Sequence, residues 1–300
     1  PSDCCGSGCT PCVFDIYERQ LQSWHDKKAG DTQGRRSDVR SDLLSETRFK
    51  PFRLIRKIRL TEGVYSFTFR PVEVLPGGCD VTENINGALP YSIGQHLVLR
   101  RCMESSNKID AEVVTDQDEP VSSSQIITRA YTPITIAAQE VNCCFEMFAK
   151  LYDQGVMSAY LKESSVDDIL YWRGPYGDFK YSPNSFRYIL MLCVGTGLAP
   201  MVPIVTSIVN DDSDDTQVHL MYGIRNINHV ILRDKLRSLT QYWNFTLEYY
   251  CSEEVEENRI VKFGEKVVST RINRESVSEY LIEKQLEQVL ALVCGTDSFT

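Results

Sequence analysis

One segment constrains the fold of this 300-residue chain more than any other, the run YILMLCVGTGLAPMVP at Tyr188–Pro203. Its apolar, β-prone residues stop at Gly195-Thr196-Gly197, and an apolar helix-like run begins near Pro200. This pattern predicts a buried strand that turns sharply into a helix. The glycines would let a phosphate approach the backbone, and the helix N-terminus would offer it unpaired N–H groups. Proline replaces the third glycine of the usual dinucleotide fingerprint, so an ordinary structural turn explains the same residues.

Beyond Tyr188 the pattern alternates between strands and helices. Such alternation predicts parallel strands joined by crossover helices, which is a doubly wound sheet. The predicted strands are Tyr188–Val194, Val218–Tyr222, Phe245–Cys251 and Val289–Val293, and the predicted helices are Ala199–Val209, Ile231–Leu239 and Ser276–Gln288. We assign residues 183–300 to this α/β domain. The chain stops soon after its last strand, and we expect the domain to be truncated at its C-terminus.

The preceding residues, 48–182, contain short strand candidates and one helix candidate near Ser158–Glu163. This arrangement predicts a six-stranded antiparallel barrel, and hence an α+β chain of two domains. The strand candidates are Arg53–Leu60, Val64–Arg70, Gln95–Arg101, Gln125–Arg129, Asn142–Lys150 and Asp168–Trp172. Two polar segments, Pro76–Pro90 and Cys102–Ser124, interrupt the barrel. The second is long for a structureless loop in a compact domain, and we interpret it as a disordered insertion.

Four cysteines lie close together at the start of the chain, at Cys4, Cys5, Cys9 and Cys12. Their thiolates would be able to surround one zinc ion or an iron–sulfur cluster. The adjacency of the first two is awkward for a tetrahedral site, and a cysteine-rich cap on a helix at Val13–Trp24 is the alternative. We treat residues 1–24 as a cysteine-rich module and the polar residues 25–47 as a flexible linker.

Composition excludes several functions and leaves one surface question open. A net charge of −9 argues against nucleic-acid binding. The chain has no apolar run of eighteen residues, so we expect no integral membrane segment. Eleven cysteines without a secretory leader favour an intracellular protein. We expect a cytoplasmic monomer, with mitochondrial or peripheral endoplasmic reticulum association as the alternatives. Arg48–Arg59 holds six basic residues and no acid, which predicts either a docking face or a protected edge strand.

Four short motifs follow one another in a fixed order. They are Arg129-Ala130-Tyr131-Thr132-Pro133, Gly155–Leu161, Gly195–Pro200 and Cys294-Gly295. As a set, this series resembles the ferredoxin–NADP reductase superfamily and, within it, the NADH–cytochrome b5 reductases, over about residues 48–299. The N-terminal segment CCGSGCTPCVFDIYERQL resembles a short oxidoreductase-like module.

The resemblance implies that the barrel binds FAD and that the α/β domain binds NADH. Arg129 would grip the FAD diphosphate, and Ser158 would cap the following helix or bind phosphate. Tyr131 would lie against the flavin ring, and Thr132 would hydrogen-bond near N5. Thr196 would contact the flavin or the nicotinamide, which Cys294 would help to position. The implied catalytic residues are Thr132, Thr196 and Cys294, and the implied cofactor-binding residues are Arg129, Tyr131, Thr132, Pro133, Lys150, Gly155, Val156, Met157, Ser158, Gly195, Thr196, Gly197, Pro200, Cys294 and Gly295.

The implied activity is that of a flavoprotein reductase. Hydride would pass from NADH to FAD, and single electrons would pass on to a haem protein, for which cytochrome b5 is the expected partner. A quinone or another metalloprotein is an alternative acceptor, and a non-catalytic or metal-binding protein on the same fold is an alternative from another class. His229 stands where NADH-selective relatives commonly carry aspartate, and Arg225 lies nearby, so NADPH stays open as the donor.

Overall fold

The computed structural model of the protein describes residues 43–74, 81–82, 88–102, 126–137, 143–253, 261–262, 265–283 and 289–300. The chain divides into the units Pro1–Val39 and Arg40–Thr300, and every described residue belongs to the second. The predicted cysteine module, and with it the candidate metal ligands, lies outside the described residues. So do most of the two polar segments of the barrel. Among the described helices, none combines the length and the apolar character that crossing a membrane requires.

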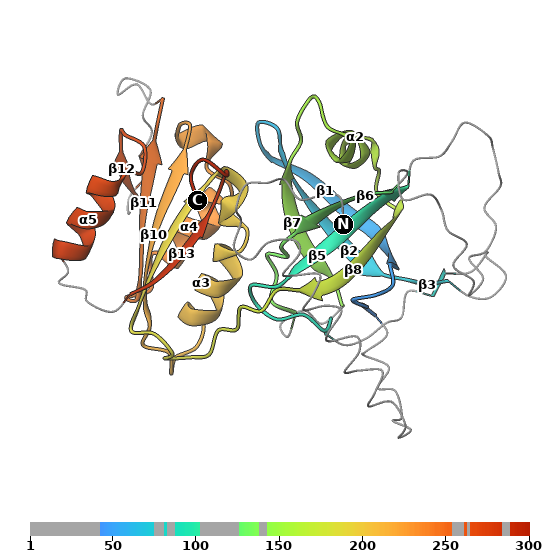
Figure 1. Cartoon of the computed structure of the whole chain (residues 1–300), viewed down its shortest axis with the longest axis horizontal. Coiled ribbons are helices and arrows are strands. Elements are labelled where there is room, and N and C mark those ends of the chain that lie inside the picture. The colour runs from blue at the N-terminus through green and yellow to red at the C-terminus, as the bar shows by residue number, and fades with distance from the viewer. Residues whose placement is uncertain are drawn as a thin grey trace, which may run out of the picture. The chain divides into compact units, whose positions relative to one another are not determined.

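The first domain is built on a six-stranded antiparallel sheet in the order β6-β5-β8-β1-β2-β7 (Figure 1), which confirms the predicted barrel architecture. The strands are β1 Lys50–Thr61, β2 Val64–Pro71, β5 His96–Cys102, β6 Ile126–Tyr131, β7 Phe145–Lys150 and β8 Ile169–Tyr176. The short strands β3 Glu73–Val74 and β4 Val81–Thr82 form a separate ribbon, and helix α2 spans Val156–Glu163. Strand β8 is longer than predicted because Arg173 and Tyr176 still pair with β5.

Aromatic rings fill the interior of the barrel. Trp172 is fully buried, and its ring centroid lies 5.0 Å from those of both Phe69 and Phe145. Phe52 meets Phe145 edge to face at 5.4 Å. Such pairs add about 0.5–1.5 kcal/mol each beyond the burial of their area. This cluster gives the barrel a rigid wall against which β6 and its cofactor motif are set.

The second domain is a five-stranded parallel sheet in the order β12-β11-β10-β9-β13. Its strands are β9 Tyr188–Val194, β10 Gln217–Ile224, β11 Phe245–Cys251, β12 Lys266–Val268 and β13 Leu290–Cys294. Its helices are α3 Met201–Val209, α4 Arg233–Leu239 and α5 Arg274–Glu283, with 3-10 turns η4 Gly195–Leu198 and η5 Ile227–His229. Helices α3 and α4 pack on one face and α5 on the other (Figure 1). The predicted doubly wound sheet is therefore confirmed, although β12 was not predicted.

The strand order reverses direction at β9. Strands β10, β11 and β12 follow one another away from β9 on one side, whereas β13 pairs with its other side. In open α/β sheets, ligands bind in the crevice outside the carboxyl ends of the strands at such a switch point. Here Thr196 follows β9 and Cys294 ends β13, so the fold brings two of the predicted catalytic residues to this crevice.

The two domains share part of one hydrophobic core. Val64, Ile134 and Phe148 of the barrel belong to the same buried cluster as nearly all the apolar residues of α3. Helix α3 is therefore apolar on both sides, since it packs on its own sheet and on the barrel. This packing places the crevice at the switch point against β6 and β7.

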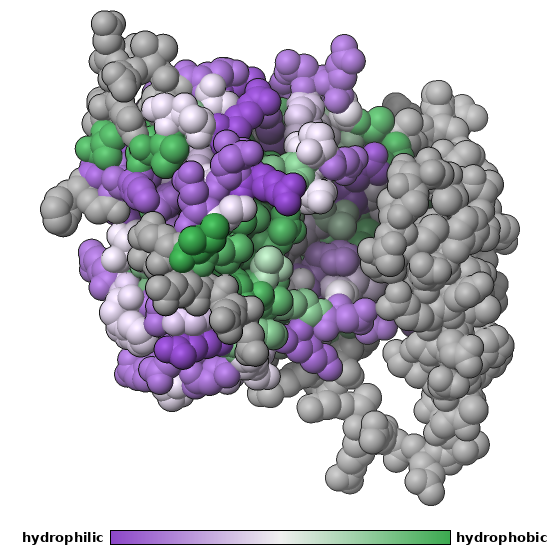
Figure 2. Space-filling model, turned by 60° about the vertical axis from the view of Figure 1, so that its left-hand side comes forward, coloured by the Kyte–Doolittle hydropathy of each residue, from purple (hydrophilic) through white to green (hydrophobic). Residues whose placement is uncertain are grey.

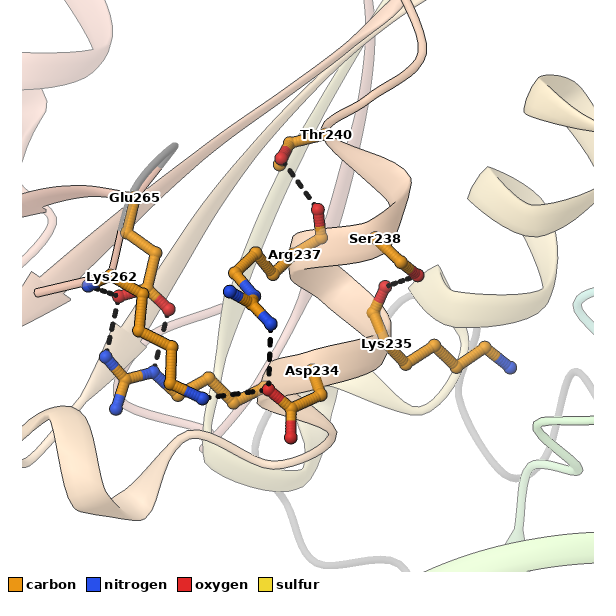
Figure 3. A network of polar contacts seen from close by, with 8 residues as sticks. Asp234, Lys235, Arg237, Ser238, Thr240, Lys262 and Glu265 are labelled. Carbon is orange, nitrogen blue, oxygen red and sulfur yellow. Dashed lines mark hydrogen bonds and ion pairs between the residues drawn. The ribbon is translucent and has the colours of Figure 1, made fainter.

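A polar network fixes the start of α4 (Figure 3). Arg233 donates from Nε and Nη2 to the two carboxylate oxygens of Glu265, at 2.7 and 2.6 Å. Burial alone would raise the pKa of Glu265, but the hydrogen bonds from Arg233 and from the Lys262 amide hold it below its ordinary value. Lys262 also donates to Asp234 at 2.9 Å. The network anchors the segment that follows η5, and with it the position of His229.

The outer surface of the α/β domain is largely polar, with apolar side chains gathered on part of one face (Figure 2). Strand β13 is the outermost strand on its side of the sheet. Its Val293 is 45% exposed, and Ile282 of α5 is 75% exposed. Cys294 therefore lies near an accessible edge of the sheet rather than deep in the core.

Candidate active site

A cleft of about 440 Å³ lies between the barrel and the α/β domain. We call it the interdomain cleft. The barrel contributes residues of β6, β7 and the start of α2, and the α/β domain contributes Thr196, Ala199, Pro200 and Cys294. Most of the predicted cofactor residues line it, and the exceptions are Pro133, Gly195, Gly197 and Gly295. The structure thus brings together motifs that are far apart in the sequence.

The exceptions have their own places around the cleft. Pro133 follows Thr132 in the chain and is buried, and Gly195 lines a neighbouring cavity. A β-carbon on Gly197 would lie 2.2 Å from the carbonyl oxygen of Cys294, and one on Gly295 would lie 2.5 Å from Cγ2 of Val194. These two glycines permit close packing between the β9 turn and the end of β13.

Arg129 stands on β6 with an exposed side chain. Its Nη1 donates to the neighbouring carbonyl of Thr128 at 2.7 Å, and among the described residues it forms no ion pair. A guanidinium has five N–H donors in a fixed fork that matches phosphate oxygens. Most of this donor capacity is therefore available at the wall of the cleft.

Helix α2 begins at the same wall. Its N-cap is Gly155, with no side-chain hydrogen bond to the first turn. The predicted cap by Ser158 is absent, because the hydroxyl of Ser158 instead accepts from the amide of Tyr152 at 3.1 Å. The first N–H groups of a helix have no intrahelical partner, so the amides of Val156 and Met157 are donors for an anion.

Basic side chains of the barrel hold α2 at both ends. Arg101 donates from Nη1 to the carbonyl of Val156 at 2.8 Å. Lys57 donates from Nζ to the carbonyls of Lys162 and Ser164 at 2.8 and 2.7 Å. Both residues lie on strands of the barrel, so the helix N-terminus is fixed relative to Arg129. Sequence reasoning missed these contacts because they join residues far apart in the chain.

Tyr131 ends β6 and lies on the same wall. Its ring meets that of Trp172 edge to face, with the centroids 5.9 Å apart. Burial raises the pKa of Tyr131 to about 12, although Arg129 opposes the shift. The phenol is therefore neutral at physiological pH and presents an aromatic surface held by the barrel core. Thr132 follows it at the edge of the cleft.

On the opposite wall, Cys294 pairs in register with Cys193 of β9. Burial raises the pKa of both thiols. A protonated thiol is a weak nucleophile, so Cys294 is suited to contact and not to covalent chemistry. The turn beside it is fixed by Tyr222, whose hydroxyl donates to the carbonyl of Gly195 at 3.0 Å.

A second cavity of about 430 Å³, the side cavity, adjoins the cleft, and Lys150 and Thr196 line both. It extends over the carboxyl end of β10, with Arg225 and His229, and reaches the β1–β2 turn, with Glu62. Nothing in the sequence pattern connects this turn to the α/β domain. The structure therefore adds a carboxylate to the site that sequence analysis did not include.

The donors at the cleft fit the diphosphate of a dinucleotide. The guanidinium of Arg129, which forms no ion pair with any described residue, and the first turn of α2, which has no side-chain cap, lie on one wall of one cavity. The adjoining side cavity lies at the carboxyl ends of β9 and β10, where doubly wound folds bind nucleotides. The residues present therefore fit one flavin dinucleotide on the barrel and one nicotinamide dinucleotide on the sheet.

Comparison with known protein families agrees with this geometry. The oxidoreductase FAD-binding domain matches residues 82–181, and the oxidoreductase NAD-binding domain matches residues 191–300. Residues 1–32 match the N-terminal module of oxidoreductase-like proteins, which confirms the resemblance seen in the cysteine-rich segment. The fold and the cleft thus define an oxidoreductase that uses FAD and NADH.

Within this class, the chain belongs to the NADH–cytochrome b5 reductase-like family. It is 35% identical over 305 residues to the human protein named NADH-cytochrome b5 reductase-like, covering 100% of this chain and 86% of the relative. The mouse protein of the same name is 33% identical over 307 residues, with the same coverage. NADH–cytochrome b5 reductase 1 of Arabidopsis thaliana is 31% identical over 68% of this chain and 62% of its own length.

Solved structures agree on the fold. The cytochrome b5 reductase domain of Ulva prolifera nitrate reductase superimposes with a TM-score of 0.64 at 21% identity, over 86% of this chain and 90% of that domain. The CS-b5R domains of human Ncb5or, in an NAD+ form, give a TM-score of 0.61 at 22% identity, over 84% and 64%. A ferredoxin NADP+ reductase from Neisseria gonorrhoeae, with bound FAD and NADP, gives 0.59 at 19% identity, over 85% and 88%.

Proposed function

We propose that this NADH oxidoreductase delivers single electrons to a haem protein of the cytochrome b5 type. The observation that carries the proposal is the interdomain cleft, where the barrel motifs face Thr196 and Cys294 across one cavity. When bound, FAD supplies the capacity to accept two electrons together and to release them one at a time. The names of the relatives, cytochrome b5 reductases, support the choice of acceptor.

The barrel residues hold and orient the flavin cofactor in this proposal. Arg129 binds the diphosphate with its planar fork, and the amides of Val156 and Met157 bind it from the helix terminus. Tyr131 supports the ring system with its face, and Thr132 donates a hydrogen bond beside it. Because Arg101 and Lys57 fix α2, both halves of the diphosphate clamp belong to one rigid domain.

The α/β domain positions the nicotinamide. Thr196 contacts it from the β9 turn, and Cys294 limits its position from the end of β13. Lys150 lies where the cleft and the side cavity meet, so it is placed to bind the nucleotide diphosphate. Holding two rings in contact accounts for much of the rate of such a transfer, and no acid–base pair is needed.

Stopped-flow spectroscopy of the flavin-loaded protein tests this function. After reduction by one equivalent of NADH, mixing with cytochrome b5 should give haem reduction in single-electron steps at least as fast as steady-state turnover. A quinone and a second metalloprotein, run in parallel, test the alternative acceptors. Slow reduction of cytochrome b5 together with fast reduction of another acceptor would overturn the assignment. A purified protein without flavin bands would favour the non-catalytic alternative.

A further inference from the structure

The side cavity contains two basic side chains that are each engaged by a carboxylate. Arg225 Nε lies 3.3 Å from Glu253 Oε2, and His229 Nε2 lies 3.5 Å from Glu62 Oε2. Arg225 and His229 sit beside the carboxyl end of β10, Glu253 follows β11, and Glu62 comes from the β1–β2 turn of the barrel. Arg225 is thus contacted by a carboxylate of its own domain, whereas His229 is contacted by a carboxylate of the barrel.

Two contacts fix the orientation of the His229 ring. Oδ1 of Asn226 accepts from the amide of Asn228 at 3.1 Å, which identifies it as the carbonyl oxygen. His229 Nδ1 lies 2.8 Å from the same oxygen and must therefore be its donor. Its Nε2 faces the carboxylate of Glu62, which belongs to the barrel.

A phosphate monoester in this cavity would meet the guanidinium of Arg225, whose planar fork suits phosphate, and the imidazole of His229. A second phosphate on the adenosine ribose is what distinguishes NADPH from NADH. Glu253 and Glu62 already engage these two side chains, and each carboxylate would also repel an incoming phosphate. Besides Glu62, Arg225 and His229, the charged groups lining the cavity are Lys150 and Asp153, and Lys150 lies toward the interdomain cleft.

We infer that Glu62 and Glu253 determine the preference for NADH over NADPH, by engaging His229 and Arg225 and so denying them to a 2′-phosphate. Glu62 thereby gives the FAD-binding domain a direct part in nucleotide selection. The inference rests on the proposed function, specifically on the adenosine end of the nucleotide lying in the side cavity. It does not depend on which protein accepts the electrons.

Binding of nucleotide fragments to the flavin-loaded protein tests the inference directly. Calorimetry would compare AMP with adenosine 2′,5′-bisphosphate in the wild type, Glu62→Gln, Glu253→Gln and the double variant. Each single variant should improve the affinity ratio in favour of the bisphosphate by up to about fivefold, the upper end of the range for exposed charge pairs. The double variant should exceed either single one, and the affinity for AMP should stay within about twofold. The ratio of kcat/KM for NADPH and NADH, with ferricyanide as oxidant, should move in the same direction.

Two further variants make the result specific. Glu279→Gln removes one exposed carboxylate from α5, on the other face of the sheet, and should leave the ratio unchanged. In a His229→Asn background, Glu62→Gln should have a smaller effect, since His229 can no longer be released and only the direct repulsion by Glu62 is removed. An unchanged ratio in the double variant, or an undiminished Glu62→Gln effect without His229, would overturn the inference.

Failure of the nucleotide placement can be recognised separately. AMP should shift the imidazole proton resonances of His229, assigned by comparison with His229→Asn. If AMP binds without moving these resonances, the placement in the side cavity is wrong and the inference falls with it. If they move while the affinity ratio stays constant in the variants, only the inference about Glu62 and Glu253 fails.

Discussion

Gly197 and Cys294 are in direct backbone contact at the point where the parallel sheet changes direction. A β-carbon on Gly197 would lie only 2.2 Å from the carbonyl oxygen of Cys294, and it would lie 2.6 Å from its carbonyl carbon. The turn that follows β9 therefore closes against the end of β13. The two motifs that we propose hold the nicotinamide are therefore parts of one packed unit.

Gly197→Ala should damage this unit. The new methyl group meets backbone, which cannot rotate away, so β13 or the η4 turn must move. Overpacking of this kind costs about 1–3 kcal/mol, and we expect a lower melting temperature and a reduced kcat/KM for NADH with ferricyanide. Thermal unfolding and steady-state assays measure both quantities.

Gly195→Ala is the matched control. Gly195 has a φ of +53°, and a β-carbon there would meet nothing within 4 Å. The change should cost about 1 kcal/mol through backbone strain while leaving the packing of Cys294 intact. If Gly197→Ala were no more harmful to activity than Gly195→Ala, the contact with Cys294 would have no functional weight.

Arg129→Ala should weaken FAD binding. The diphosphate loses charge-assisted hydrogen bonds of roughly 1.5–3 kcal/mol, which corresponds to about tenfold to a hundredfold in Kd. Flavin fluorescence during dilution measures the change. Arg129→Lys keeps the charge without the fork and should give an intermediate Kd. A variant that purifies with full flavin content would place the diphosphate elsewhere.

The sequence predicted the architecture because both domains have strong local signals. Strands β9 and β11 lie where their apolar runs placed them, at Tyr188–Val194 and Phe245–Cys251. Strand β12 has only three residues, none of them buried, and so no apolar run marked it. The sharp turn after β9 was predicted, but its 3-10 form, η4 at Gly195–Leu198, was not, and the helix predicted from Ala199 begins at Met201.

The site was predictable where its residues belong to short motifs and not where it depends on contacts between domains. The segments at Arg129–Thr132 and Gly155–Ser158 do line one cleft with Thr196. Glu62 could not be assigned to the nucleotide region from its sequence, because only the packing of the barrel on the α/β domain brings it to His229.

The raised pKa of Tyr131 predicts a loss of stability at high pH. The folded state resists ionising this phenol until about pH 12, whereas the unfolded chain ionises it near pH 10. Its contribution is thus complete below pH 10 and is lost as pH rises from 10 to 12. Over this window the free energy of unfolding should fall more steeply in the wild type than in Tyr131→Phe, by on the order of 2 kcal/mol. Urea titrations at each pH measure this free energy. If it fell equally with pH in the wild type and in Tyr131→Phe, the buried setting of Tyr131 would be contradicted.

The structure changes the interpretation of the basic segment Arg48–Arg59. Its strand, β1, pairs with both β2 and β8 at its start, so it is not simply a protected edge strand. Lys57 donates to the last carbonyls of α2, and burial lowers its pKa although Asp168 opposes the shift. Arg53 pairs with Asp167 at 3.6 Å. Lys57 is therefore a structural residue, and changing it would disturb α2 as well as the surface charge.

Arg56 is the appropriate residue for testing a docking face. It is exposed, and among the described residues it pairs with no acid. If cytochrome b5, an acidic partner, approaches this face, Arg56→Glu should slow haem reduction severalfold at low salt. The effect should fade as the screening length falls to about 8 Å at physiological ionic strength. Turnover with ferricyanide should be unchanged, because that small oxidant needs no docking surface.

Arg271→Glu is the matched control. It lies at an exposed position between β12 and α5 and makes the same change in net charge away from the barrel. Equal slowing by both variants would show that net charge matters and that the Arg56 surface is not the docking face.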